Sequence, residues 1–236
     1  MYVNFKMMKK IVFICALIFP CILVSQKIIT KDIGDFTSLK VYNGIKLELI
    51  KSEHQKIEIT GEKSEITKIK NVNNTLKISL PFSLKPENNS ADGKILVKLY
   101  YNKNIAIIDA NEGSTITGKD LSQDKLEVNS QERAFIDLII NVKHVDVKAS
   151  SGGIIKLSGN TKNQNVNLDL YGIYHGFGLK AENTSTVKAG TGAKAEVLAG
   201  EMLTAIVSFG GSIFYKGNPE VIKDKKVIGG IIKKRD

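Results

Sequence analysis

The stretch that decides the fold is residues 147–155, Val-Lys-Ala-Ser-Ser-Gly-Gly-Ile-Ile, which returns at 187–195 as Val-Lys-Ala-Gly-Thr-Gly-Ala-Lys-Ala. Each copy has an apolar alternation, a corner that contains glycine, and a second alternation. Alternation is typical of a half-buried strand, and glycine allows the chain to turn sharply. Further copies begin at Ile108, Val128, Leu168 and Val207. The six starts are spaced 20, 19, 21, 19 and 20 residues apart, and a repeat of about 20 residues with glycine corners predicts a β-solenoid.

The rest of the chain after residue 27 also alternates with period two, so we expect an all-β protein. A mostly parallel, β-helix-like solenoid with coils of about 20 residues is expected over residues 105–217. The strands of residues 36–100 continue this stack or cap its N-terminal end, and Pro81 to Gly93 leaves the sheet as a loop. An antiparallel sandwich with regularly spaced hairpins would give the same period and is the alternative.

Two apolar ladders are expected inside the coils, because inward side chains stack on their equivalents one coil away. A second apolar position follows the first by about eight residues in each repeat, at Ile116, Ile136, Ile155, Phe177, Ala195 and Phe214. The residues that should be buried are Val128, Ile136, Val147, Ile155, Leu168, Val187 and Val207.

Residues 1–25 are predicted to be a secretory signal peptide. Lys9 and Lys10 precede an apolar run from Ile11 to Val24, which is too short for a typical membrane span. Both cysteines, Cys15 and Cys21, lie in this leader. Pro20 stands where lipidation of Cys21 needs a small residue, so lipidation is not expected. A mature chain without cysteine excludes disulfides, thiolate metal sites and a cysteine nucleophile.

The remaining organisation is expected to be an N-terminal extension at 26–35, the solenoid domain at 36–219, and a C-terminal strand with a basic tail at 220–236.

The formal charge of +10 falls to 10 − 3 = +7 when three leader lysines are removed. Only Arg133 and Arg235 are arginines, and nucleic-acid surfaces favour clustered arginine with aromatics. No nucleic-acid partner is expected. The lysines read as solvated side chains on strand faces, or as a weakly basic surface for anionic glycans or lipid headgroups.

Three segments resemble the putative auto-transporter adhesin "head GIN" domain family. They are the opening Phe36-Thr37-Ser38-Leu39-Lys40-Val41 with Gly44-Ile45-Lys46-Leu47, the glycine corners at 150–153 and 190–192, and the ending Gly210-Gly211-Ser212-Ile213-Phe214-Tyr215-Lys216-Gly217-Asn218-Pro219. The resemblance covers residues 36–232. It implies a β-helix-like fold and a non-catalytic role in an exported protein of Bacteroidetes. The chain departs from the family pattern at 171–178, where a small corner is expected.

That departure supplies the candidate binding residues. The longest repeat, with an advance of 21 residues, contains Tyr171, Tyr174, His175 and Phe177. Extra length in one coil is expected to bulge outward, where tyrosine and histidine can stack on sugar rings or pack on a partner. In the other interpretation, Phe177 points inward and Tyr174 only covers the adjacent corner.

A second candidate is the pair Glu112 and Glu132, which the repeat places one coil apart with Arg133 beside them. Two stacked carboxylates can contact a cation or a sugar. Polysaccharide lyases and hydrolases on β-helices need two or three converging carboxylates, and this column offers only two. The three histidines are isolated, with no metal-ligand spacing. We therefore expect no catalytic residues, no metal and no cofactor.

The sequence favours an exported, non-catalytic envelope or cell-surface protein with a binding, adhesion-like or structural role. Its partner would be a glycan or an envelope protein, and the mature chain has no transmembrane span. The location would be the periplasm, the outer-membrane surface or the extracellular space. The alternatives are a carbohydrate-active enzyme on a β-helix, and an exported scaffold or stress protein without a small ligand.

Overall fold

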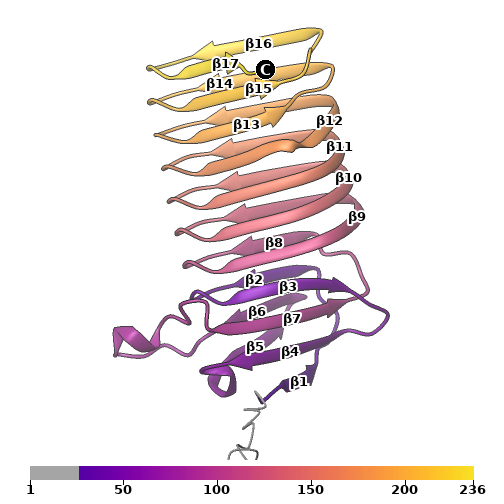
Figure 1. The fold of residues 1–236 in the computed structure, drawn as a ribbon, viewed down its shortest axis with the longest axis vertical. Coiled ribbons are helices and arrows are strands. Elements are labelled where there is room, and N and C mark those ends of the chain that lie inside the picture. Colours follow the sequence, from indigo (N-terminus) through magenta and orange to yellow (C-terminus); the bar gives the residue numbers. More distant parts are fainter. Residues whose placement is uncertain (1–26) are drawn as a thin grey trace, which may run out of the picture.

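The computed structural model describes residues 27–236, so the signal peptide prediction lies outside the described residues. The chain forms a column of stacked coils with its C-terminus at one end (Figure 1). The predicted all-β solenoid is confirmed, with about seven turns. Within residues 27–236, no helix is long and apolar enough to cross a membrane.

Seventeen strands and two short 3₁₀ turns make up the described chain. They are β1 (Ile29–Asp32), β2 (Ser38–Val41), β3 (Lys46–Lys51), β4 (Lys56–Gly61), η1 (Ser64–Ile66), β5 (Lys68–Val72), β6 (Thr75–Ser79), η2 (Pro86–Asn88), β7 (Ile95–Tyr101), β8 (Ile107–Ala110), β9 (Thr115–Ser130), β10 (Phe135–Ala149), β11 (Ile154–Leu168), β12 (Ile173–Ala189), β13 (Lys194–Leu198), β14 (Met202–Val207), β15 (Ser212–Lys216), β16 (Val221–Lys226) and β17 (Ile231–Lys234).

From β8 onward every strand pairing is parallel. Strands β9 to β12 each bend once and contribute to both sides of the flattened coil. The N-terminal strands both continue and cap the stack: β2 and β3 pair in parallel with β8 and β9, whereas β1, β4 and β5 pair antiparallel below them. The loop after β6 projects from the column, as predicted (Figure 1).

One edge of the column consists of tight four-residue corners. In most of them both central residues have positive φ and the fourth N–H donates to the first carbonyl, as in a type I′ turn. The central pairs with positive φ are Asn43-Gly44, Glu112-Gly113, Glu132-Arg133, Ser151-Gly152, Leu170-Tyr171 and Phe209-Gly210. Consecutive corners are also joined: the third residue's N–H donates to the second residue's carbonyl in the next corner, with N···O distances from 2.8 to 3.3 Å. A ladder of hydrogen bonds therefore runs along this edge.

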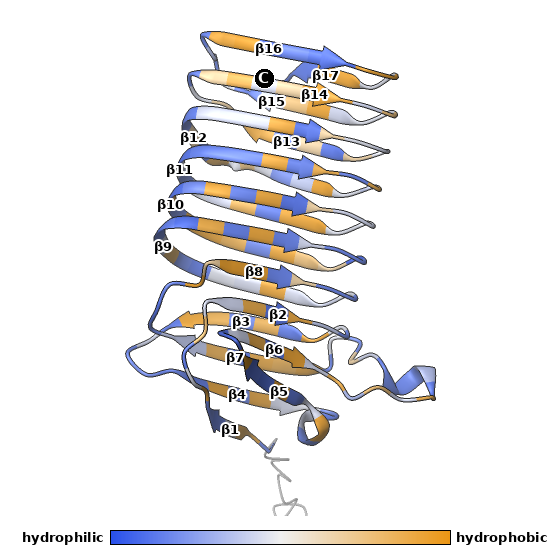
Figure 2. Cartoon of the chain, turned by 180° about the vertical axis from the view of Figure 1, so that it is seen from behind, coloured by the Kyte–Doolittle hydropathy of each residue, from blue (hydrophilic) through white to orange (hydrophobic). Residues whose placement is uncertain are grey.

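Polar and apolar residues alternate along the strands, so one set of side chains fills the interior (Figure 2). All seven residues predicted to be buried are at most 1% exposed. The assignment to two ladders needs correction, since Leu168 and Val207 stack with Ala149 and Ala189 rather than with Val147. The true spacing of the Ile108 column is 20, 19, 19, 21 and 18 residues, through Val128, Val147, Val166, Val187 and Ala205. A slip of two residues keeps a side chain inward, which is why the burial was predicted correctly while the column was not.

The C-terminal coil ends the stack with charges at inward positions. Ala205 pairs with Asp224, Val207 with Lys226, and Tyr215 with Lys234. Charged side chains at these positions cannot be covered by a further apolar coil without a large desolvation cost. This coil therefore protects an open sheet edge from end-to-end association.

Substituting Val147 by Asp should prevent folding. Val147 lies between Val128 and Val166 in the buried stack, and an unpaired carboxylate there costs several kcal/mol, comparable with the whole stability of a domain. Circular dichroism melting should show no cooperative transition. Asn167→Asp, which places the same charge at an exposed position on β11, should melt like the wild type. A soluble, cooperatively melting Val147→Asp protein would contradict the register.

Substituting Arg133 by Gly should stabilise the protein. Arg133 has φ of 61° at a position where most other corners have glycine. A left-handed conformation costs an L residue about 1–2 kcal/mol, partly offset by the greater entropy that glycine loses on folding. We expect the free energy of unfolding in urea to rise by about 0.5–1 kcal/mol. Gly152→Ala tests the same position in reverse: its Cβ would be 3.6 Å from the nearest atom, Arg133 Cγ, so a loss of about 1 kcal/mol would come from φ alone.

Candidate binding surface

The two broad faces of the solenoid differ in their outward side chains. We call the face formed by strands that follow a corner the first face; it contains β13, β15 and the N-terminal halves of β9 to β12. The opposite, second face contains β14 and the C-terminal halves of β9 to β12. Outward positions of the second face on β9 to β12 are all polar, from Lys125 to Lys188. The first face carries seven outward apolar side chains, which are Phe135, Ile139, Ile154, Ile173, Phe177, Leu198 and Phe214.

A line of charged groups crosses the first face beside these apolar residues. Lys156 Nζ lies 2.9 Å from Asp137 Oδ2 on the preceding coil. On the next two coils, His175 Nδ1 lies 2.8 Å from Glu196 Oε2, and Lys194 Nζ lies 2.6 Å from Glu196 Oε1. Burial by itself raises the pKa of the Glu196 carboxyl, but the hydrogen bonds from Lys194 and His175 outweigh it and hold this pKa below its usual value. Glu196 is therefore a fixed anion, and His175 Nδ1 is engaged by it.

The aromatic rings of this face have cations over them. Lys216 Nζ lies 5.3 Å from the ring centre of Phe177, and the Arg235 guanidinium lies 4.4 Å from that of Phe214. Lys194 also reaches Phe214, at 5.7 Å. Cation and ring together form a half-buried polar and apolar surface, the kind that binds sugars and protein side chains.

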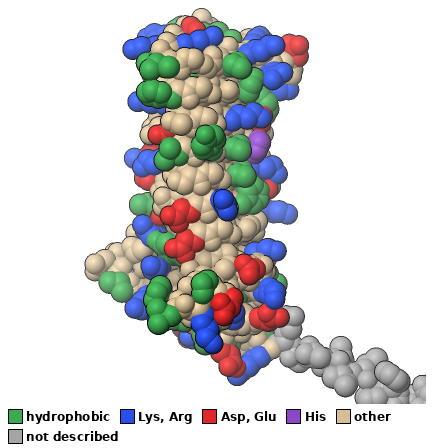
Figure 3. All heavy atoms as spheres, turned by 90° about the vertical axis from the view of Figure 1, so that its left-hand side faces the viewer, with side chains coloured by type: hydrophobic (Ala, Val, Ile, Leu, Met, Phe, Trp, Pro, Cys, Tyr) green, Lys and Arg blue, Asp and Glu red, His purple; other side chains and the backbone are tan. Residues whose placement is uncertain are grey.

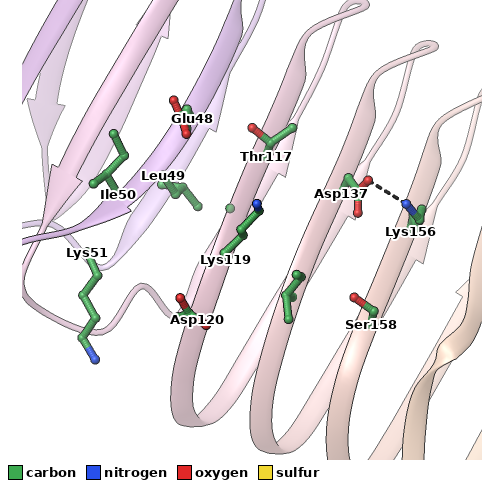
Figure 4. A pocket seen from close by; sticks show the side chains of 12 residues that line it. Glu48, Leu49, Ile50, Lys51, Thr117, Lys119, Asp120, Asp137, Lys156 and Ser158 are labelled. Atoms are coloured by element: carbon green, nitrogen blue, oxygen red, sulfur yellow. Dashed lines mark hydrogen bonds and ion pairs between the residues drawn. The ribbon is translucent and has the colours of Figure 1, made fainter.

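A groove opens the same face at its N-terminal end, where β3 and β9 separate (Figure 4). The two strands pair only as far as Leu49 and Gly118, whereas the other edge of β3 pairs with β7 along its whole length, to Lys51. The groove has a volume of about 560 Å³, and its lining includes Lys51, Lys119 and Asp120. Asp137 and Lys156 form its far wall, so the groove is continuous with the line of charges.

The four residues predicted to share one bulge occupy three different environments. Tyr171 lies on the corner edge and is 68% exposed. His175 and Phe177 lie on the first face. The extra length does bulge there, since Lys156 pairs with His175 but Ser158 pairs with Gly178. Tyr174 is fully buried and is not available to a ligand.

Tyr174 belongs to a hydrogen-bonded trio inside the coils. Its hydroxyl donates to Gln164 Oε1 at 3.1 Å, and Gln164 Nε2 donates to Ser185 Oγ at 3.0 Å. Burial raises the pKa of the Tyr174 hydroxyl far above its ordinary value. Gly176 makes room for the ring, because a Cβ there would lie 2.4 Å from Tyr174 Cε1. Tyr174 thus takes the inward position that the repeat assigned to Phe177, and Ile213 takes that of Phe214.

Glu112 and Glu132 occupy the same position in consecutive corners, as the repeat predicted, and Gly113 N donates to the Glu132 carbonyl at 2.9 Å. Asn43 Nδ2 donates to Glu112 Oε2 at 2.6 Å. Glu112 also lines a cavity of about 560 Å³ beneath the loop that contains Phe82. In the described part of the chain, no group of three His, Cys, Asp or Glu residues could hold a metal ion. The structure brings neither glutamate onto the face of His175 and Phe177.

Sequence reasoning missed Glu196 and Phe214 as surface partners of His175. They pair in one outward line, with His175 opposite Glu196 and Glu196 opposite Phe214. The repeat could have shown this, because an alignment of Tyr174 with Ile155 and Ala195 places His175 beside Glu196.

Fold and surface define a parallel β-solenoid whose first face is mixed apolar and charged, and whose second face is polar on β9 to β12 but carries outward Met202 and Ile206 on β14. The chain belongs to the family described as "Putative auto-transporter adhesin, head GIN domain", which matches residues 35–219. This confirms the resemblance seen in the sequence. No curated protein matches the chain.

Solved structures show the same fold. A putative adhesin from Bacteroides fragilis has 21% identity and a TM-score of 0.78, with 89% of this chain and 97% of that chain covered. A protein from Parabacteroides distasonis named as a putative lipid binding protein has 20% identity and a TM-score of 0.64, with the same coverage. A putative adhesin from Parabacteroides merdae has 18% identity and a TM-score of 0.63, covering 89% and 96%. At these identities the likeness shows the fold.

Substituting Tyr174 by Phe should destabilise the protein by about 1–3 kcal/mol, because the Gln164 amide oxygen loses its buried donor. Urea unfolding would measure the loss. The triple variant Tyr174→Phe/Gln164→Leu/Ser185→Ala removes every member of the trio and should recover part of it. A single variant as stable as the wild type would mean that water satisfies Gln164.

Proposed function

We propose that this protein is an exported, non-catalytic binding module of the cell envelope, which engages a glycan or an envelope protein through its first face. The observation that supports this best is the contrast between the faces. The fold demands apolar residues only at inward positions, yet five outward positions of the first face on β9 to β12 are apolar, while those of the second face on the same four strands are polar. Exposed apolar surface bordered by charges is typical of interaction sites.

The affinity of such a site depends on repetition. One aromatic ring stacked on a sugar contributes about 1–2 kcal/mol, which alone corresponds to millimolar binding or weaker. Phe177 and Phe214 with the His175–Glu196 pair offer several contacts along one line. A long glycan or a protein partner with a large footprint can use them simultaneously, as can several copies of the module in an array.

The test is binding of the purified protein to isolated envelope material and to a glycan array. His175→Ala/Phe177→Ala should weaken binding about tenfold, which corresponds to about 1.4 kcal/mol. Asn165→Ala/Asn167→Ala, two exposed residues on the second face, should bind like the wild type. Equal binding by both variants would rule out the first face. Tyr174 is unsuitable for substitution here because it is buried in the core.

The second candidate, a carbohydrate-active enzyme, is favoured by one observation only: His175 and Glu196 are hydrogen-bonded on an open face, a pairing that general acid–base catalysis can use. Release of reducing sugar from polysaccharides would measure it. We expect none from the wild type. Turnover that is lost in Glu196→Gln, or in Glu112→Gln/Glu132→Gln, would replace the binding proposal with an enzyme.

A further inference from the structure

A strip of exposed apolar side chains runs along the corner edge in the C-terminal half of the column. This corner strip consists of Leu170, Tyr171, Phe209, Val227 and Ile228, which are 50%, 68%, 59%, 53% and 57% exposed. Figure 3 faces this edge and shows hydrophobic side chains gathered along its upper part. The strip is continuous across the intervening corner, because the Tyr171 ring lies over Gly192, where a Cβ would be 2.6 Å from Tyr171 Cε1.

The strip occupies positions where the fold disfavours such residues. Leu170, Tyr171 and Phe209 have φ of 45°, 62° and 49°, a conformation that suits Asn, Asp and Gly. The corner at Asn43-Gly44 shows the favourable choice. Bulky apolar residues there carry backbone strain and leave their side chains in water, so their presence is not explained by folding. Strain at exposed positions indicates a function.

The shape of the strip does not fit an ordinary protein interface. Its side chains come from three corners of one edge, and five residues are far fewer than the roughly 20–30 per side of a standard interface. A lipid bilayer accepts protruding apolar side chains one by one, without a complementary groove.

The charges around the strip suit an anionic surface. Residues 212–236 carry seven Lys and Arg against three Asp and Glu, and this segment includes Val227 and Ile228. Lys225 and Lys226 immediately precede them. The three corners of the strip contain one carboxylate, Asp169, which accepts from the backbone N–H of Leu170 at 2.9 Å and of Thr191 at 2.8 Å. These hydrogen bonds lower its pKa, so it stays anionic and is a single negative charge against the excess of lysine and arginine.

We propose that the corner strip inserts into the surface of an anionic lipid bilayer, while lysines of the last coil bind the headgroups. The strip is parallel to the axis of the column, so the protein would lie on the membrane along its corner edge. Both broad faces then remain open, and the first face is free to bind its partner. This proposal goes beyond the binding function of the first face and does not depend on it.

The test is co-sedimentation of residues 27–236 with vesicles of phosphatidylcholine and phosphatidylglycerol in equal parts. Wild type should bind these vesicles, should bind less at high salt, and should bind pure phosphatidylcholine poorly. Leu170→Asn/Tyr171→Gly/Phe209→Asn should reduce the partition coefficient about tenfold or more, because three inserted side chains are lost. The same variant should melt at or above the wild-type temperature, since it restores favourable turn residues.

Asn165→Ala/Asn167→Ala is the control, because these exposed residues lie on the second face, away from the corner edge, and the change leaves the net charge unaltered. It should bind vesicles like the wild type. His175→Ala/Phe177→Ala should also keep vesicle binding, which separates this proposal from that for the first face. The proposal would be wrong if the wild type did not bind anionic vesicles, or if the triple variant bound them as strongly as the wild type. The proposal would also fail if the triple variant lost binding to a protein partner while the wild type bound no vesicles.

Discussion

The hydrogen bond between consecutive corners is the constraint on which the rest of the structure depends. Each corner donates the N–H of its third residue to the carbonyl of the second residue in the next corner, so every coil must pass this edge at the same place. The parallel pairing on either side of the corner fixes the register of neighbouring coils at this edge. Coils of 18 to 21 residues must therefore absorb their differences away from the corners. β12 does so with two bulges, one at Gly176-Phe177 and one at Glu182-Asn183.

This constraint explains what the sequence could predict. Because all corners lie in line, their glycines and small residues repeat in phase, and the solenoid and its buried positions follow from them. The repeat does not determine which residues of successive coils stack in one column, because an error of two residues leaves a side chain on the same side of the strand. Leu168 was assigned to the wrong column in this way although its burial was predicted correctly. A single-residue bulge has a greater effect, since it moves every later residue to the opposite face. Phe177 lies at such a bulge, and no feature of the repeat shows where the extra residue is inserted.

The candidate surface was harder to predict than the core for a related reason. Neighbours across a solenoid face are about one coil apart in sequence, as His175, Glu196 and Phe214 are. The outward column that contains them repeats no residue type from Asp137 to Phe214, so only the correct register brings these three together. Tyr174 shows the converse difficulty: its ring is buried only because Gly176 leaves space and Gln164 accepts a hydrogen bond from its hydroxyl. Neither partner can be recognised as such from the alternation alone.

The departures from the repeat are concentrated in one coil. The turn from β11 to β12 carries two bulky residues with positive φ, β12 has both bulges, and the buried trio joins β11 to β12. A stack of identical coils would be more regular without any of them. Natural sequences break local rules chiefly where function requires it. This coil is also where the outward aromatic of the first face and the strained tyrosine of the corner edge come closest in sequence, at Phe177 and Tyr171. Phe177 lies on the broad face beside the bulge and the corner holds Tyr171 at the edge, so a single irregular coil supplies both surfaces while its neighbours hold it in register.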